Sequence, residues 1–252
     1  MMNYFLTIAA SDNSGGAGIQ QDIKVAYQYG YWPLSAITGI TVQDFYNVYK
    51  VEPVKPELLK EQIEQCFESF PVKTVKIGAI CSHENLNIIV SCLKKYTPCH
   101  VVLDTVLFSS SGASFLNNSS YDVMKETLFP LTELITPNKI EFELLTNQHF
   151  SSINQAINIA KEVCKQWKTS ILIKGGHFSG TNLCEALVSP TDVLQYKRPK
   201  KNFQYSHGTG CTLSSAMACN LGMGKTFNES YLHASQFLVD YYEKMQQNWL
   251  KE

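Results

Sequence analysis

The sequence predicts an α/β fold in which helices cover a mostly parallel β-sheet. Short apolar runs rich in β-branched residues alternate with longer stretches of helical periodicity, an order typical of parallel strands joined by right-handed crossovers. Each apolar run is nearly continuous, as in strands that are buried on both faces. The six runs are residues 4–10, 34–42, 74–80, 100–104, 133–136 and 170–174.

Helical stretches lie between these runs. Residues 19–30 carry an apolar stripe at helical spacing, and a second helix begins at Pro56, a first-turn proline. Ser152 and Gln155 have the spacing of a capping box before a third helix. Small and apolar residues with good helix-forming character fill 212–221. These stretches provide the crossovers that parallel strands require.

The late segment 182–197 reads as two strands around a Ser-Pro turn, and we expect this pair to be antiparallel to the rest. No linker, repeat or low-complexity segment interrupts the pattern. We therefore expect residues 1–252 to form a single domain.

Composition limits the classes of function. The chain has 252 residues, a net charge of −1, 44% hydrophobic and 17% charged residues, which is ordinary for a globular protein. No basic patch with interleaved aromatics favours nucleic acid, and no apolar run reaches the length of a membrane span. The N-terminus lacks a basic leader, and the eight cysteines lack a CxxC pair and metal-ligand spacing with histidine. We expect free thiols and a cytoplasmic protein that binds neither nucleic acid nor membrane.

Polar or small residues follow the apolar runs at their carboxyl ends. In open α/β sheets ligands bind outside these strand ends, so the six positions should share one rim of the sheet. Each position alone is more simply explained as a loop residue, but six together favour a binding site. They are Asp12, Gln43, Gly78, Asp104, Asn138 and Lys174.

The segment from His207 to Cys211 places two glycines directly before a helix. Backbone N–H groups converge there at the positive end of the helix dipole, which suits phosphate or a developing negative charge. Cys211 stands at the helix start, where the pKa of a thiol is usually lowered. A tight turn with an N-cap is the alternative. By contrast, Gly222-Met223-Gly224-Lys225-Thr226 lacks the earlier glycine of a P-loop and predicts a helix end and turn.

A second glycine-rich segment, Ser14 to Gly18, follows the first strand. It lacks the third glycine of a dinucleotide fingerprint, so a Rossmann site is disfavoured. On the following helix Asp22 lies at the edge of the apolar stripe, close to this segment. Its carboxylate therefore either faces a ligand or forms a solvated flank of the helix.

Seven segments occur in the order found in one enzyme family: TIAASDNSGGAGIQQDIK, TVQD, VKIGAI, VVLDTVL, ITPNKIEFELL, ILIKGGH and HGTGCTLSSA. The chain thereby resembles hydroxymethylpyrimidine/phosphomethylpyrimidine kinases, ribokinase-like enzymes of thiamine biosynthesis. Cys211 is distinctive, because neighbouring sugar kinases carry aspartate there. The resemblance implies a ribokinase-like three-layer sandwich with a mostly parallel central sheet.

The resemblance also implies roles for individual residues. On the substrate side, Gln43 recognises the aminopyrimidine ring, Asp22 hydrogen-bonds to it, and Gly15 and Gly16 let the substrate lie close to backbone. On the phosphate side, a catalytic anion hole binds the transferring group, and ATP and Mg²⁺ are cofactors. The anion hole is Gly208, Thr209, Gly210 and Cys211, ATP faces Lys174, Asn138 and Thr209, and the Mg²⁺ region holds Glu141 and Asp104. Whether the Cys211 thiol takes a proton or only shapes the hole stays open.

Three positions depart from the family pattern. The family commonly has methionine near Ala79, proline at Thr105 and a lid lysine at Ser110. The loss of the lysine removes a charge that could close over phosphates, and Ala79 would loosen the ring pocket.

The leading hypothesis is ATP-dependent phosphorylation of 4-amino-5-hydroxymethyl-2-methylpyrimidine and its monophosphate, by a homodimer as is common among similar proteins. Pyridoxal kinase activity is one alternative, but enzymes specialised for it often carry a lid cysteine and lack the glutamine found here at Gln43. A pyrimidine-binding protein with weakened catalysis is the other alternative, motivated by the lost lid lysine.

Overall fold

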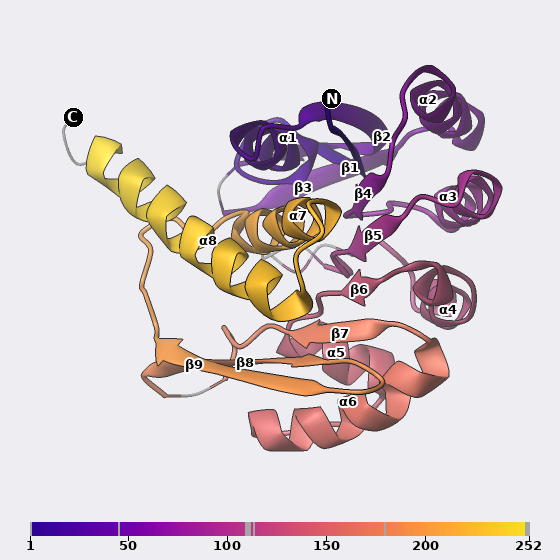
Figure 1. Ribbon diagram of the computed structural model, residues 1–252. Helices are drawn as coiled ribbons and strands as arrows, with labels where there is room; N and C mark the ends of the chain where they lie inside the picture. The colour runs from indigo at the N-terminus through magenta and orange to yellow at the C-terminus, as the bar shows by residue number, and fades with distance from the viewer. Residues whose placement is uncertain (1, 45, 109–111, 113, 179, 250–252) are drawn as a thin grey trace.

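The strands form one twisted sheet in the computed structural model, which describes residues 2–44, 46–108, 112, 114–178 and 180–249 (Figure 1). The order is β3-β2-β1-β4-β5-β6-β7-β8-β9. Neighbouring strands from β2 to β7 are parallel, whereas β3, β8 and β9 pair in the antiparallel sense. The bounds are β1 Tyr4–Asp12, β2 Trp32–Gln43, β3 Val48–Pro53, β4 Thr74–Ile77, β5 His100–Leu103, β6 Leu134–Ile135, β7 Ser170–Ile173, β8 Asn182–Val188 and β9 Val193–Pro199.

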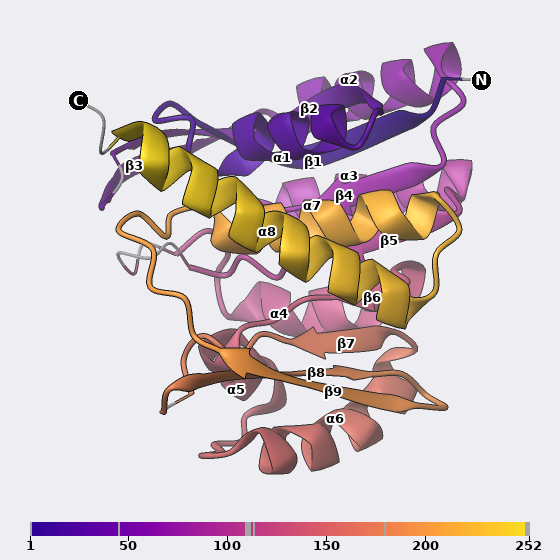
Figure 2. The same cartoon turned by 60° about the vertical axis from the view of Figure 1, so that its left-hand side comes forward.

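Helices cover both faces of the sheet. Helices α1, α7 and α8 lie on one face, and Figure 2 shows α8 running across α7. Helices α2, α3, α4 and α6 cover the opposite face. The bounds are α1 Gly18–Gln28, α2 Pro56–Ser69, α3 His83–Tyr96, α4 Ser119–Val123, α5 Lys139–Thr146, α6 Ile153–Trp167, α7 Thr209–Gly222 and α8 Phe227–Trp249, with a π-helical turn at Met124–Leu128 and a 3-10 turn at Phe129–Leu131.

Alternate residues of the central strands supply two separate cores. Phe5 and Val102 pack with α1, α7 and α8, whereas Leu6 and Leu103 pack with the helices of the other face. This alternation follows from the twofold period of a strand, and it explains why the runs are apolar on both sides. The α/β three-layer arrangement predicted from the sequence is confirmed.

Local signals in the sequence account for several element boundaries. Pro56 occupies the first turn of α2, and Ser152 forms the expected capping box with Gln155 at the start of α6. The segment 182–197 forms the expected strand pair, but only its first strand, β8, runs antiparallel to the rest of the sheet, because β9 reverses again beside β8. Helix α7 ends at Gly222, and the chain turns toward α8 with Gly224 at φ +80°. The segment therefore joins two helices, whereas a P-loop follows a strand, and the P-loop is excluded.

Two further expectations concern the cysteines and membranes. All eight cysteines are free thiols, as expected. None of the helices in the described part of the chain has the length and apolar character that a membrane crossing requires.

Candidate active site

A cavity of about 400 Å³ opens at the carboxyl ends of the parallel strands. All six residues that the sequence placed on one rim line it, from β1, β2, β4, β5, β6 and β7 in turn. The shared rim is therefore confirmed as a geometric fact. These residues are Asp12, Gln43, Gly78, Asp104, Asn138 and Lys174.

The first turn of α7 forms part of the cavity wall. Gly208 adopts a left-handed φ of +81°, and a Cβ there would lie 1.9 Å from the carbonyl oxygen of Gly16. Only glycine allows this close approach between the two loops. The helix then presents Gly210 and Cys211 to the cavity, with amides that have no acceptor inside the helix. This end of α7 can therefore bind an anion.

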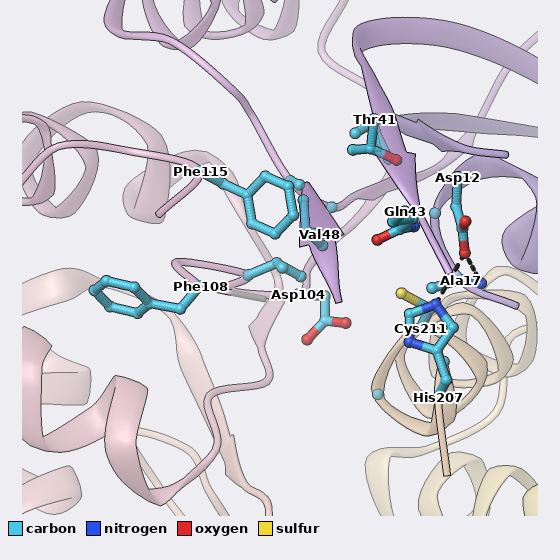
Figure 3. A pocket seen from close by; sticks show the side chains of 18 of the residues that line it. Asp12, Ala17, Thr41, Gln43, Val48, Asp104, Phe108, Phe115, His207 and Cys211 are labelled. Atoms are coloured by element: carbon cyan, nitrogen blue, oxygen red, sulfur yellow. Dashed lines mark hydrogen bonds and ion pairs between the residues drawn. The ribbon is translucent and has the colours of Figure 1, made fainter. Parts of the chain in front are cut away.

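The Cys211 thiol differs from the sequence expectation. Figure 3 shows its sulfur directed into the cavity. Burial raises the pKa of the thiol to about 11, and the carboxylates of Asp22 and Asp104 act in the same direction against the favourable charge of Lys76. The lowered pKa expected from a helix N-terminus is therefore wrong. The thiol is protonated at neutral pH and is a poor general base.

A buried ion cluster lies beside the α7 N-terminus. Lys174 Nζ is 2.7 Å from Asp104 Oδ1 and 4.0 Å from Glu141 Oε2. A Cβ on Gly210 would lie 3.4 Å from Lys174 Nζ and 3.5 Å from Asp104 Oδ2. The cation, the carboxylate and the helix end therefore converge on one point.

Hydrogen bonds hold the two carboxylates of this cluster. Asp104 accepts from Thr136 at 3.0 Å and from Ser214 at 3.2 Å. Glu141 caps the backbone N–H of Asn138 at 2.8 Å, and Asn138 caps Glu141 in return. Burial raises the pKa of Glu141, whereas for Asp104 the nearby lysines outweigh burial and lower it. Glu141 thus gains a proton more readily than Asp104.

Asp12 organises the loop between β1 and α1. Its carboxylate accepts the backbone N–H groups of Ser14 at 2.7 Å and Ala17 at 2.8 Å, and it lies 2.9 Å from Nε2 of His207. Burial alone would raise its pKa, but hydrogen bonds from His207, Ser14 and Gln43 hold the pKa well below its usual range. Figure 3 shows the bonds from the Asp12 carboxylate to His207 and Ala17, with Gln43 and Cys211 nearby.

Apolar and amide groups line the wall opposite α7. Gln43 is buried at the end of β2, and Thr41, Val48, Val106 and Phe115 surround the space in front of it. Figure 3 shows Gln43 and Phe115 on this wall. Such a wall suits a flat heteroaromatic ring with one hydrogen-bonding edge.

Three sequence-predicted substrate residues lie elsewhere. Asp22 is fully buried, and both its oxygens are occupied by Lys76 at 2.8 Å, with further bonds from Thr7 and Ser215. Its expected hydrogen bond to a ring is therefore corrected, because the carboxylate does not reach the cavity. Gly15 and Gly16 line a second, smaller hollow behind the loop, and Ala17 and Gly18 face the main cavity in their place. The carbonyl oxygen of Gly16 instead lies against Gly208 at the start of α7.

Sequence reasoning missed Lys76, which lies at the cavity although its side chain is fully buried. A lysine inside the otherwise apolar run 74–77 was the signal available, because such a residue needs a buried anion. Asp22 is that anion. The three departures are placed unevenly: Ala79 lines the cavity, Thr105 donates to Glu141 Oε2 at 3.2 Å, and Ser110 lies outside the described residues.

The chain is similar in sequence to known kinases. The sequence matches the phosphomethylpyrimidine kinase family over residues 12–248. The chain belongs to this kinase family. A hydroxymethylpyrimidine/phosphomethylpyrimidine kinase of Aquifex aeolicus (strain VF5) is 34% identical over 235 residues, 93% of this chain and 92% of the relative. The family expected from the seven segments is thus confirmed.

Solved structures of kinases share the fold. A phosphomethylpyrimidine kinase from Clostridium difficile 630 is 34% identical, with a TM-score of 0.83 over 95% of this chain and 99% of that chain. A Bacillus subtilis pyridoxal kinase, solved as an ADP complex, is 26% identical, with a TM-score of 0.84 over 94% and 90%. The expected ribokinase-like architecture of this phosphomethylpyrimidine kinase family member is confirmed.

Proposed function

We propose that the protein phosphorylates 4-amino-5-hydroxymethyl-2-methylpyrimidine, and then its monophosphate, with ATP in thiamine biosynthesis. One observation carries the proposal: a single cavity joins the wall around Gln43, which suits a flat ring, to the start of α7, which suits an anion. Family membership indicates the reaction class. The wall around Gln43 would bind the ring substrate, and the start of α7 would bind the phosphate of ATP.

The proposed division of labour follows the charges. Gln43 would hydrogen-bond to the ring, and Ala17 and Gly18 would let the ring lie close to backbone. The amides of Gly210 and Cys211 would hold the transferring phosphoryl group, and Lys174 would neutralise it. Phosphoryl transfer needs mainly positioning and charge stabilisation, which these groups provide. Asn138 and Thr209 line the same cavity, and they would contact the nucleotide.

Magnesium fits the same cluster. Mg²⁺ prefers one or two carboxylates together with phosphate oxygens and water, and Asp104 and Glu141 are the carboxylates available on the cavity wall. Lys174 Nζ lies 2.7 Å from Asp104 and 4.0 Å from Glu141, so its charge would add to that of the ion beside the phosphates. When bound, Mg²⁺ would neutralise charge on the phosphates of ATP.

The Cys211 thiol would shape the anion hole and act neither as base nor as nucleophile. Its raised pKa supports this reading, because a neutral thiol donates a weak hydrogen bond and repels no phosphate. Alkoxide formation would instead be favoured by the surrounding amides and cations as charge develops.

Substrate choice is tested by measuring product formation from ATP, Mg²⁺ and either the hydroxymethylpyrimidine or pyridoxal. We expect faster turnover of the pyrimidine, and Gln43→Leu should raise its KM more than that of pyridoxal. Faster turnover of pyridoxal would favour the alternative suggested by the fold shared with pyridoxal kinase. Ring binding without ADP release would favour a binding protein.

We further infer a cytoplasmic homodimer with one domain per chain. Ile40 and Val42 project from the same face of β2 and are 54% and 52% exposed, so they offer an apolar surface on an outer strand pair. Sedimentation analysis tests this inference, with Ile40→Glu and Val42→Glu together expected to yield monomers. An unchanged sedimentation coefficient would place any interface elsewhere.

A further inference from the structure

The loop after β1 and the segment before α7 are joined by a side-chain pair. His207 Nε2 lies 2.9 Å from Asp12 Oδ2, and both residues line the cavity. An ionised carboxylate can only accept hydrogen bonds, so Nε2 carries the proton of this bond. Such charge-assisted bonds are shorter and stronger than neutral ones.

The pair fixes more than two side chains. The same Asp12 carboxylate accepts the N–H groups of Ser14 and Ala17, so it sets the path of the chain that faces the ring. On the other side, His207 directly precedes Gly208, the N-cap of α7. The hydroxyl of Tyr242 donates to the carbonyl oxygen of His207 at 2.8 Å. One bond therefore spans the two walls of the cavity.

A second contact reinforces the same junction. Gly208 and Gly16 meet so closely that a Cβ on Gly208 would lie 1.9 Å from the Gly16 carbonyl oxygen. Gln43, the amide of the ring wall, also helps to lower the pKa of Asp12. Carboxylate, imidazole and the start of α7 thus form one connected series, and Figure 3 shows the bonds from Asp12 to His207 and Ala17 with Gln43 nearby.

We propose that Asp12 and His207 are positioning residues that set the distance between the hydroxymethyl oxygen on the ring wall and the phosphorus at the α7 N-terminus. The inference rests on the proposed kinase function. In the aligned complex the oxygen–phosphorus bond to the ring substrate forms as the bond between the γ-phosphorus and the bridging oxygen of ATP breaks, and the hydroxyl proton is released to water. Misplacement of reacting groups by about 1 Å can cost about 100-fold in rate.

Loss of alignment has a diagnostic consequence. With the ring oxygen displaced, water can take its place at the phosphorus, and ATP plus water then gives ADP and inorganic phosphate. The ratio of ADP formed to phosphate groups transferred to the ring therefore rises above one. If the pair only stabilised the fold, its loss would lower the unfolding temperature and leave this ratio unchanged.

The test compares His207→Phe with Tyr242→Phe. His207→Phe breaks the bond to Asp12, whereas Tyr242→Phe keeps that bond and removes the hydroxyl that donates to the His207 carbonyl oxygen and lies 3.4 Å from Thr212. For His207→Phe we expect kcat to fall about 10- to 100-fold, ring and ADP affinities to change less than threefold, and the product ratio to exceed one. Tyr242→Phe should keep a ratio of one.

Two outcomes overturn the inference. Wild-type kcat and a ratio of one in a folded His207→Phe variant would show that the pair does not position the reaction. An equal rise of the ratio in Tyr242→Phe would assign the effect to general loosening. If His207→Phe does not fold, Asp12→Asn supports the same comparison. A wild-type protein that phosphorylates no ring substrate would instead refute the proposed function itself.

Discussion

Gly210→Ala separates the stability of α7 from its proposed work. Gly210 is the second residue of the helix, and its φ lies outside the left-handed region. An added Cβ would meet Lys174 Nζ at 3.4 Å and Asp104 Oδ2 at 3.5 Å, which are ordinary contact distances. The substitution therefore fits the folded chain, and the methyl group points into the proposed phosphoryl site.

The two expected effects have opposite signs. Alanine is favoured over glycine in helices by up to about 1 kcal/mol, so the melting temperature should stay equal or rise by about 2 °C for a chain of this length. Removal of one donor from an oxyanion site typically costs 10²–10³ in kcat, so a methyl that keeps the phosphoryl group from the amides should cost about 100-fold.

Thermal unfolding and steady-state ADP release, both on purified protein, measure these effects. A stable Gly210→Ala protein with low kcat supports the anion-hole assignment. A stable variant with wild-type kcat refutes it, because the transferring group could not then occupy the space beside Gly210. Loss of stability would instead show that the α7 entry is tighter than the contacts indicate.

Three more predictions concern the same junction. Gly208→Ala should lower the melting temperature by several degrees, because φ +81° and a 1.9 Å approach to Gly16 leave no room for a side chain; thermal unfolding checks it, and an unchanged value contradicts the packing. Cys211 should react with iodoacetamide at pH 8 about 100-fold more slowly than an ordinary thiol, since its pKa rises from 9.0 to about 11. Site-resolved mass spectrometry measures the two rates, with the exposed Cys99 as control, and equal rates would contradict the prediction. The pKa of Asp12 is lowered on folding, so its contribution to stability is present above about pH 4 and is lost as pH falls further; the stability difference between wild type and Asp12→Asn should therefore shrink below pH 4 in acid titrations, and a constant difference would contradict the assignment.

The sequence predicted the sheet well because its strands are buried on both faces. The run 170–174 is apolar at 171–173 and ends in Lys174, so the sequence shows both the strand and the polar residue at its carboxyl end. Strand β3 was missed, because Val48–Pro53 is an exposed outer strand with polar residues and no buried pattern. Its position is set by pairing with β2 and not by its own composition.

The sequence predicted the residues at the rim of the candidate site better than the contacts of its buried charged groups. Strand ends show in a sequence, whereas the partner of a buried charge depends on contacts between distant segments. The family resemblance assigned Asp22 to the ring, and its spacing on the helix allowed either a ligand or solvent, but Lys76, 54 positions away, binds the carboxylate. Likewise the Cys211 pKa follows from burial, which local position at a helix start does not reveal.

Phosphorylation of the ring tests the central claim most directly. Purified protein is incubated with ATP, Mg²⁺ and 4-amino-5-hydroxymethyl-2-methylpyrimidine, and the products are followed by mass spectrometry and ADP release. The account predicts a ring monophosphate, then a diphosphate, with one ADP for each phosphate transferred. ADP release without ring phosphate, or no ADP release with ring bound, would contradict it.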